Sequence, residues 1–107
     1  MSGQASGTPF SETATHATAA VASHAAVAGR TYYITDISAS SDKAGALMLV
    51  KQGTTIIWQS QLAATAAGNL SYEHTFQTPI RGAKSALVSV EIDGISVCHA
   101  NIAGYEL

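Results

Sequence analysis

The chain has 107 residues, enough for one domain that hides roughly two thirds of its unfolded surface on folding. Charged residues make up 11% of it, hydrophobic residues 47%, and the formal net charge is -2. The five Lys and Arg residues are scattered, which excludes a basic stripe for phosphate groups, so we expect no nucleic acid partner. With so few charges, some apolar surface is expected to meet another chain.

Residues 1–15 are rich in Ser, Thr, Gly and Ala, a composition that predicts a flexible N-terminal arm. Thr8, Pro9 and Phe10 supply its one apolar anchor. We expect neither a signal peptide nor a membrane contact, because the beginning of the chain has no basic residues and the apolar stretch at 17–28 is short and interrupted by polar residues.

The segment 16–27 allows two readings. Its alanines favour a helix, which Ser11 or Thr13 could cap and Gly29 could end. Such a helix would lack a large apolar stripe, whereas a strand of small residues can lie along a sheet edge beside the strand that starts at Arg30. We therefore expect an extended strand here.

Beyond Gly29, short apolar runs of β type alternate with turns, and a Thr78-Pro79 bend precedes one more short element at 79–81. Strands of this length and spacing are typical of sheets packed face to face. The sequence predicts an all-β fold, an antiparallel jelly-roll-like β-sandwich of about eight strands over residues 16–107. Its six strong strands are expected at 31–37, 46–50, 54–58, 70–76, 86–92 and 95–103.

Turn chemistry suggests how these strands are joined. Asp93-Gly94 is the strongest signal for a two-residue hairpin, because both residues accept positive φ values. Gln52-Gly53 predicts a second tight hairpin, and residues 67–69 favour a broader reversal.

Two strands lack a polar face. The run 46–50 is apolar on both sides, and the run 31–37 places Tyr32 and Ile34 on one side and Tyr33 and Ile37 on the other. These two strands are therefore candidates for a subunit contact.

Residue types that bind metals are sparse. Cys98 is the single cysteine, which predicts a buried thiol and excludes an intrachain disulfide. The four histidines never occur at ligand spacing, so we expect no metal and no cofactor. Copies of His74 or His99 gathered on a symmetry axis could bind an ion, although histidines packed on strands are far more common.

Catalytic patterns are absent from the sequence as well. Among the carboxylates of Asp36, Glu73, Glu91 and Asp93, Asp93 is needed for its turn and Glu73 and Glu91 lie on solvated strand faces, so surface residues are expected instead of a glycosidase pair. No nucleophile elbow or Ser, His and Asp set can be assigned. We expect no catalytic residues and no enzyme. A small hydrolase would instead need a cleft that gathers His74 or His99 with a carboxylate and a nucleophile. An aromatic sugar platform built on Trp58 and the tyrosines is a further alternative to packing.

Several segments in chain order resemble small virion proteins of tailed bacteriophages. They are Ala-Gly-Arg at 28–30, Tyr-Ile-Thr-Asp-Ile-Ser-Ala-Ser at 33–40, Gly-Thr-Thr-Ile-Ile-Trp at 53–58, Phe-Gln-Thr-Pro-Ile-Arg-Gly-Ala at 76–83 and Gly-Tyr at 104–105. The resemblance covers roughly residues 25–107.

This resemblance implies a jelly-roll decoration, or cement, protein. Such a protein is made in the bacterial host cytoplasm, trimerises, and binds the major capsid protein on the outer surface of the assembled capsid. The segment Thr8, Pro9 and Phe10 would then be the capsid-binding arm. The alternative is a glycan- or receptor-binding module of a head fibre or tail spike. The residues expected at the trimer interface are Tyr33, Ile37, Leu47, Leu49 and His99.

Overall fold

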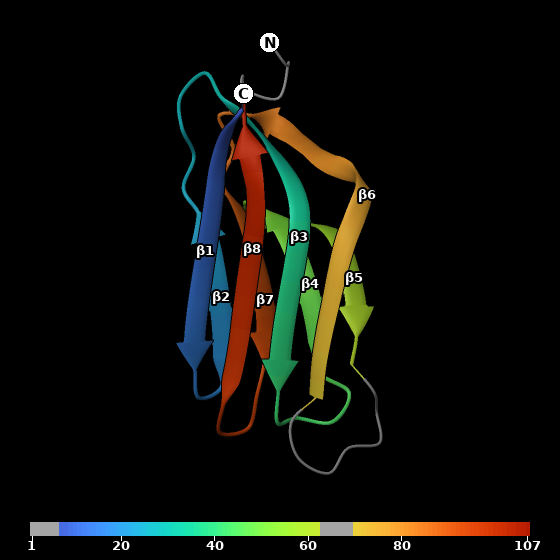
Figure 1. Cartoon of the computed structure of the whole chain (residues 1–107). Helices are drawn as coiled ribbons and strands as arrows, with labels where there is room; N and C mark the ends of the chain where they lie inside the picture. Colours follow the sequence, from blue (N-terminus) through green and yellow to red (C-terminus); the bar gives the residue numbers. More distant parts are fainter. Residues whose placement is uncertain (1–6, 63–69) are drawn as a thin grey trace.

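The computed structural model describes residues 7–62 and 70–107. These residues form two four-stranded sheets packed face to face (Figure 1). The eight strands are β1 (Thr8–His16), β2 (Ala19–His24), β3 (Thr31–Ser41), β4 (Leu47–Gln52), β5 (Thr55–Gln61), β6 (Leu70–Lys84), β7 (Val88–Asp93) and β8 (Cys98–Glu106).

All the strand pairs are antiparallel. Sheet A has the order β1-β8-β3-β6, and sheet B has the order β2-β7-β4-β5. The pairs β1·β8, β2·β7, β3·β6 and β4·β5 join the first half of the chain to the second half in reverse order. The chain is thus one long ribbon folded back on itself at the β4–β5 turn. The predicted all-β, antiparallel sandwich of about eight strands is confirmed.

The core lies between the two sheets and follows the period of two expected of half-buried strands. In β7 the inward residues Val88, Val90 and Ile92 are fully buried, and Met48 and Val50 of β4 are buried beside them. Sheet A contributes the other side of the core through Tyr32, Ile34, Ile37, Ala39, Cys98, Ala100 and Ile102.

An irregularity in β3 interrupts the alternation. The register of β3 against both β6 and β8 shifts between Ile34 and Asp36. Such a bulge adds one residue to one strand and reverses the facing of the residues that follow. Ile37 consequently faces inward with Ile34 and is 3% exposed. The expectation that Ile37 shares a face with Tyr33 is therefore wrong.

One of the two predicted hairpins is present. The turn after Gln52 joins β4 to β5, with Gln52 opposite Thr55 and Gly53 at φ 60°, so this prediction is confirmed. The predicted Asp93-Gly94 hairpin is wrong, because β7 and β8 belong to different sheets and the segment between them crosses from one to the other. The reversal expected at 67–69 lies outside the described residues.

The N-terminal segment is more ordered than its composition predicts. Residues 8–16 form β1, which pairs along its whole length with β8, so the flexible arm predicted over 1–15 is wrong for this part. The physical reason is that Phe10 and Ala14 alternate with polar residues and pack against the core. Residues 1–6 of the predicted arm lie outside the described residues.

The strand expected within 16–27 is confirmed as β2. It lies at a sheet edge, as expected, but its neighbour is β7 instead of the strand that starts at Arg30. Likewise, the predicted element at 79–81 is the end of the long strand β6. β6 is an edge strand, the position in a sheet where a proline such as Pro79 is tolerated.

Candidate functional site

The five residues predicted for a trimer interface are divided between two opposite outer faces and the core. Tyr33 and His99 are on the outer face of sheet A, and Leu47 and Leu49 are on the outer face of sheet B. Ile37 is buried in the core, so it cannot contact a second copy. The structure therefore does not bring the five together.

The outer face of sheet B carries an apolar patch. We call Val21, Leu47, Leu49 and Ile56 the sheet B patch; Val21, Leu47 and Ile56 are 46%, 43% and 49% exposed. The backbone register places Val21 and Leu49 on either side of Glu91. Three of the four strands of the sheet thus contribute an apolar side chain to one exposed surface.

An ion pair lies in the middle of this patch. Lys51 of β4 and Glu91 of β7 are 2.9 Å apart, and their side chains are about one quarter exposed. Because each charge neutralises the other, the patch has no net charge and can approach another apolar surface without burying an unpaired ion.

A second apolar group is at one end of the sandwich. Val27, Leu87 and Leu107, which we call the end patch, are 40%, 39% and 41% exposed. Backbone hydrogen bonds connect the three neighbouring segments: the Arg30 N–H donates to the Val27 carbonyl, the Ser85 N–H donates to the Arg30 carbonyl, and Leu107 exchanges two bonds with Thr31. Figure 1 shows the C-terminus at this end of the sandwich.

In contrast, the outer face of sheet A is polar. Its cross-strand rows run Ser11, Ala103, Asp36, Thr75 and Thr13, Asn101, Ser38, Glu73. The small side chains of these rows leave a hollow of about 180 Å³ above the middle of the sheet.

Hydrogen bonds within this hollow hold the Asp36 carboxylate in place. The Thr75 hydroxyl donates to Oδ1 at 2.8 Å, and the Thr35 hydroxyl donates to Oδ2 at 2.9 Å. The hollow offers hydroxyl groups, an amide and two carboxylates to solvent. His74 follows Glu73 in β6, but its side chain lies on the opposite face, so it is not gathered with these carboxylates.

His74 belongs to an aromatic cluster at the open side of the sandwich, between the edge strands β5 and β6. The rings of Tyr72, His74 and Phe76 lie 6.3, 5.3 and 5.6 Å from Trp58, centroid to centroid. All four residues are half-buried. The cluster thus connects sheet B to sheet A at this side of the sandwich.

The tyrosines outside that cluster lie elsewhere. The Tyr32 ring is buried, its hydroxyl donates to Gln52 Oε1 at 2.8 Å, and burial raises the pKa of this hydroxyl. Tyr33 and Tyr105 stack on the outer face of sheet A at 5.0 Å. The tyrosines and Trp58 therefore form no single sugar platform.

The predicted capsid-binding residues occupy the first three positions of β1. Thr8 and Pro9 are exposed, whereas the Phe10 ring stacks on the ring of His24 at 3.9 Å. Phe10 is thus a packed residue of the sandwich, which contradicts its expected place in a free arm.

The four histidines are held separately. His16 and His99 are exposed, and His99 Nδ1 lies 2.9 Å from the Thr15 hydroxyl. His24 lies between the carboxylates of Glu12 and Glu106. Among residues 7–62 and 70–107, no three His, Cys, Asp or Glu side chains gather as a metal site requires.

The single cysteine has the environment that the sequence predicts. Cys98 is fully buried, which confirms the expected buried thiol. Burial also raises the pKa of this thiol, with a smaller contribution from the nearby Asp42 and Asp93 carboxylates, so the reactive thiolate is disfavoured.

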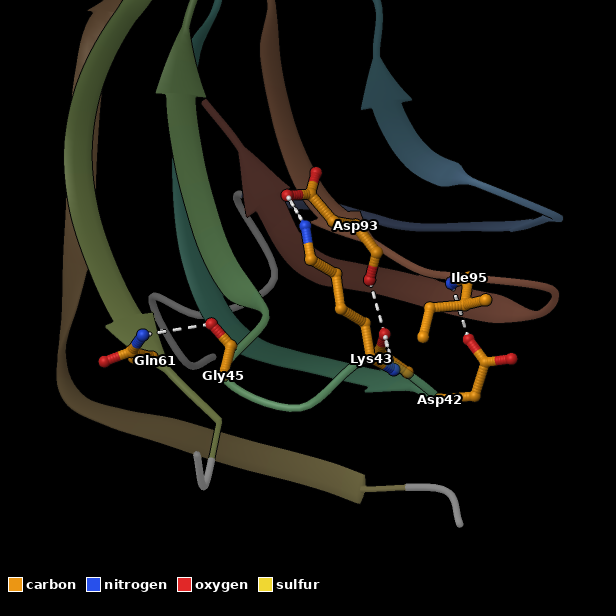
Figure 2. A network of polar contacts seen from close by, with 7 residues as sticks. Asp42, Lys43, Gly45, Gln61, Asp93 and Ile95 are labelled. Carbon is orange, nitrogen blue, oxygen red and sulfur yellow. Dashed lines mark hydrogen bonds and ion pairs between the residues drawn. The ribbon is translucent and has the colours of Figure 1, made fainter. Parts of the chain in front are cut away.

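A polar network fastens the loops at the other end of the sandwich (Figure 2). The Asp42 carboxylate, just after β3, accepts hydrogen bonds from the Ser96 hydroxyl and from the backbone N–H groups of Ile95, Ser96 and Val97. These bonds, first the Ser96 hydroxyl and then the Ile95 N–H, hold the pKa of Asp42 well below its usual range. Lys43 reaches Asp93 at 3.4 Å beside it.

The sequence singled out neither Asp42 nor the group formed by Glu12, His24 and Glu106. Asp42 falls in a loop, and its partners are more than fifty residues away. Glu12 could have been found from its spacing, because it lies two residues from both Phe10 and Ala14. In a strand, residues with this spacing lie on the same face, which here is the inner face.

A comparison with known protein families and with curated proteins found no match for this chain. Within the described residues, the structure contains no helix long and apolar enough to cross a membrane.

Proposed function

We propose that this protein is a non-enzymatic bacteriophage capsid decoration protein, a homotrimer that binds the outer surface of the assembled capsid and stabilises contacts between major capsid protein subunits. The observation that carries the proposal is the pair of exposed apolar patches on a small rigid sandwich of low charge. The resemblance of residues 25–107 to small phage virion proteins gives that surface its biological setting.

The fold supports this proposal through its strand order. We infer a jelly roll, because a ribbon with the pairs β1·β8, β2·β7, β3·β6 and β4·β5, closed into the sheets β1-β8-β3-β6 and β2-β7-β4-β5, has the order that two nested Greek keys produce. Viral capsid proteins are among the proteins that use jelly rolls. Such a scaffold is stiff, as a protein that clamps neighbouring shell subunits must be.

The two patches suggest how three copies join. A three-fold ring connects one surface of each copy to a different surface of the next, whereas two opposite, parallel faces would stack copies into an open filament. The outer faces of sheets A and B point in opposite directions, so Tyr33 and His99 are poor partners for Leu47 and Leu49. In our proposal the sheet B patch of one copy meets the end patch of the next.

This arrangement leaves the polar outer face of sheet A free to meet the shell. Thr8 and Pro9 are exposed, but Thr8 pairs with Glu106 beside the end patch, so these two residues are candidates for capsid contact only at the rim of the contact between copies. Phe10 is withdrawn from the contact because its ring is packed against His24. Three copies in one ring would bind several shell subunits at once, so weak contacts would add up to stable attachment.

The test is co-sedimentation of the purified protein with undecorated phage heads. The proposal predicts saturable binding in a fixed ratio to the capsid lattice, and decorated heads that resist heat or low-salt disruption better than bare heads. Leu49→Lys places a charge in the sheet B patch and is expected to abolish both effects. Thr13→Lys, on the exposed face of sheet A, is the matched control for trimer formation. No binding of the wild-type protein to any head would remove the decoration role.

The second candidate is a glycan- or receptor-binding module of a fibre or spike. The observation in its favour is the half-buried cluster of Trp58, Tyr72, His74 and Phe76, since aromatic faces stack on sugars and jelly rolls also occur in lectin domains. A glycan array decides between the two: a clear positive that Trp58→Ala removes would favour this candidate over decoration.

A further inference from the structure

Three titratable side chains occupy inward-facing positions where the fold calls for apolar residues. Glu12 lies in β1 between Phe10 and Ala14, both of which pack against the core. Glu106 continues the inward series of β8, and His24 continues the inward series of β2. Two carboxylates from sheet A therefore meet one imidazole from sheet B inside the sandwich.

Both nitrogens of the imidazole face a carboxylate. His24 Nδ1 is 3.1 Å from Glu12 Oε2, and His24 Nε2 is 3.2 Å from Glu106 Oε2. The side chains of His24 and Glu106 are each 13% exposed, and that of Glu12 is 39% exposed. Phe10 stacks on the ring at 3.9 Å and 8°, which fixes the plane in which the two nitrogens point.

This geometry needs a proton. A neutral imidazole has one N–H donor, and an ionised carboxylate can only accept, so a neutral ring would leave one nitrogen lone pair against a carboxylate oxygen. The imidazolium ion donates from both nitrogens and places a positive charge between two negative ones. Removing that proton leaves two carboxylates, partly shielded from water, with no cation between them.

We propose that Glu12, His24 and Glu106 form a proton-dependent latch that fastens the edge strand β1 and the end of β8 to β2 of the opposite sheet. β1 is the element most exposed to loss of the latch, because β8 is its one ladder partner. When the ring is protonated the two sheets are joined at this side. When it is neutral, β1 opens more often.

The direction of the pH dependence follows from which protonation state the fold favours. The charged groups that the described contacts bring to His24 are Glu12 from β1 and Glu106 from β8, whereas its register partner in β7 is the uncharged Val88. Only the doubly protonated ring donates to both carboxylates. The latch is therefore complete while the ring carries both protons, and one of its two hydrogen bonds is lost when rising pH removes one of them.

The test is native-state hydrogen exchange of backbone amides, expressed as protection factors so that the ordinary pH dependence of exchange cancels. From pH 6 to pH 8.5 the amides of β1 are expected to lose protection by about tenfold, while those of Met48 and Val50 in β4 keep theirs. His24→Gln cannot be protonated, so its β1 amides should change by less than about twofold. A parallel loss in β1 and β4, or no loss in β1, would overturn the latch.

A measurement on the wild-type protein guards against variants that fold poorly. The ¹⁵N chemical shifts of the His24 ring report whether one or both nitrogens carry a proton. The proposal predicts a doubly protonated ring in the folded protein at pH 6 and a change to the neutral ring over the same pH range as the loss of β1 protection. A ring that stays neutral throughout pH 5 to 8 would contradict the proposal.

Discussion

Replacing Gly104 with alanine should damage the fold at the point where β3 and β8 come closest. A Cβ at position 104 would lie 2.0 Å from the carbonyl oxygen of Tyr33, and real Cβ contacts are essentially never shorter than 3.0 Å. The obstacle is backbone, which cannot swing aside as a side chain can, so the two strands must separate by about 1 Å. Their pairing at Ile34 opposite Gly104 lies next to the register shift that turns Ile37 inward.

The size of the effect follows from this separation. A 1 Å increase stretches the neighbouring ladder hydrogen bonds beyond bonding distance, at a net cost of about 0.5–1.5 kcal/mol each. With two or three bonds and some loss of packing affected, Gly104→Ala should lower the free energy of unfolding by about 2–4 kcal/mol. In a domain of this size that lowers the melting temperature by roughly 10 to 30 °C.

Urea denaturation at one fixed protein concentration measures this difference, since self-association would make the result depend on concentration. The control is Gly29→Ala: Gly29 has φ 79° and no atom within 4 Å of an added Cβ, so only backbone strain of about 1 kcal/mol is expected. If Gly104→Ala is as stable as Gly29→Ala, the close approach of β3 and β8 does not exist as described.

Two further predictions concern Asp42 and Cys98. Because hydrogen bonds from Ser96 and Ile95 lower the pKa of Asp42 in the folded state, its stabilising contribution is full above about pH 4 and is lost as the pH falls through the lowered value. Melting curves from pH 7 to pH 2 should therefore fall more steeply for the wild type than for Asp42→Asn, and parallel curves would contradict the network. The buried Cys98 thiol, whose pKa is raised by burial, should resist thiol reagents in the native protein and react in concentrated guanidinium chloride; rapid labelling of native protein would contradict its burial.

The alternation of apolar and polar residues was sufficient to predict the fold class. In β6 and β7 it follows the inner and outer faces directly, with Tyr72 and Phe76 half-buried and Ser71 and Glu73 exposed. The β4–β5 hairpin was predictable because Gly53 provides the positive φ that its turn requires.

Features set by distant pairing were not predictable from local chemistry. Nothing in the sequence near Ile37 marks the register shift that buries it, since the shift is defined by the pairing of β3 with two strands that lie far away in the chain, β6 and β8. Asp93-Gly94 has the composition of a hairpin, but β7 is already paired with β2 and β4, so the chain must cross to the other sheet.

The candidate surfaces were predictable only where a local pattern in the sequence marked them. Leu47 and Leu49 were identified because their strand is apolar on both sides, and the structure places them on the outer face of sheet B. No local pattern marked Ile56 or Leu87. Ile56 becomes part of the sheet B patch, and Leu87 part of the end patch, only when the chain is folded. Glu12 was missed because the composition of residues 1–15 suggested an arm, and a flexible arm has no inner face.

Self-association through the sheet B patch is the central claim of this account, and the mass of the protein in solution tests it most directly. Light scattering coupled to size exclusion, at micromolar concentration, should give three times the 11.0 kDa of one chain for the wild type and for Thr13→Lys. Leu49→Lys should give the mass of a folded monomer. A wild-type protein that is folded and monomeric at these concentrations would contradict the account.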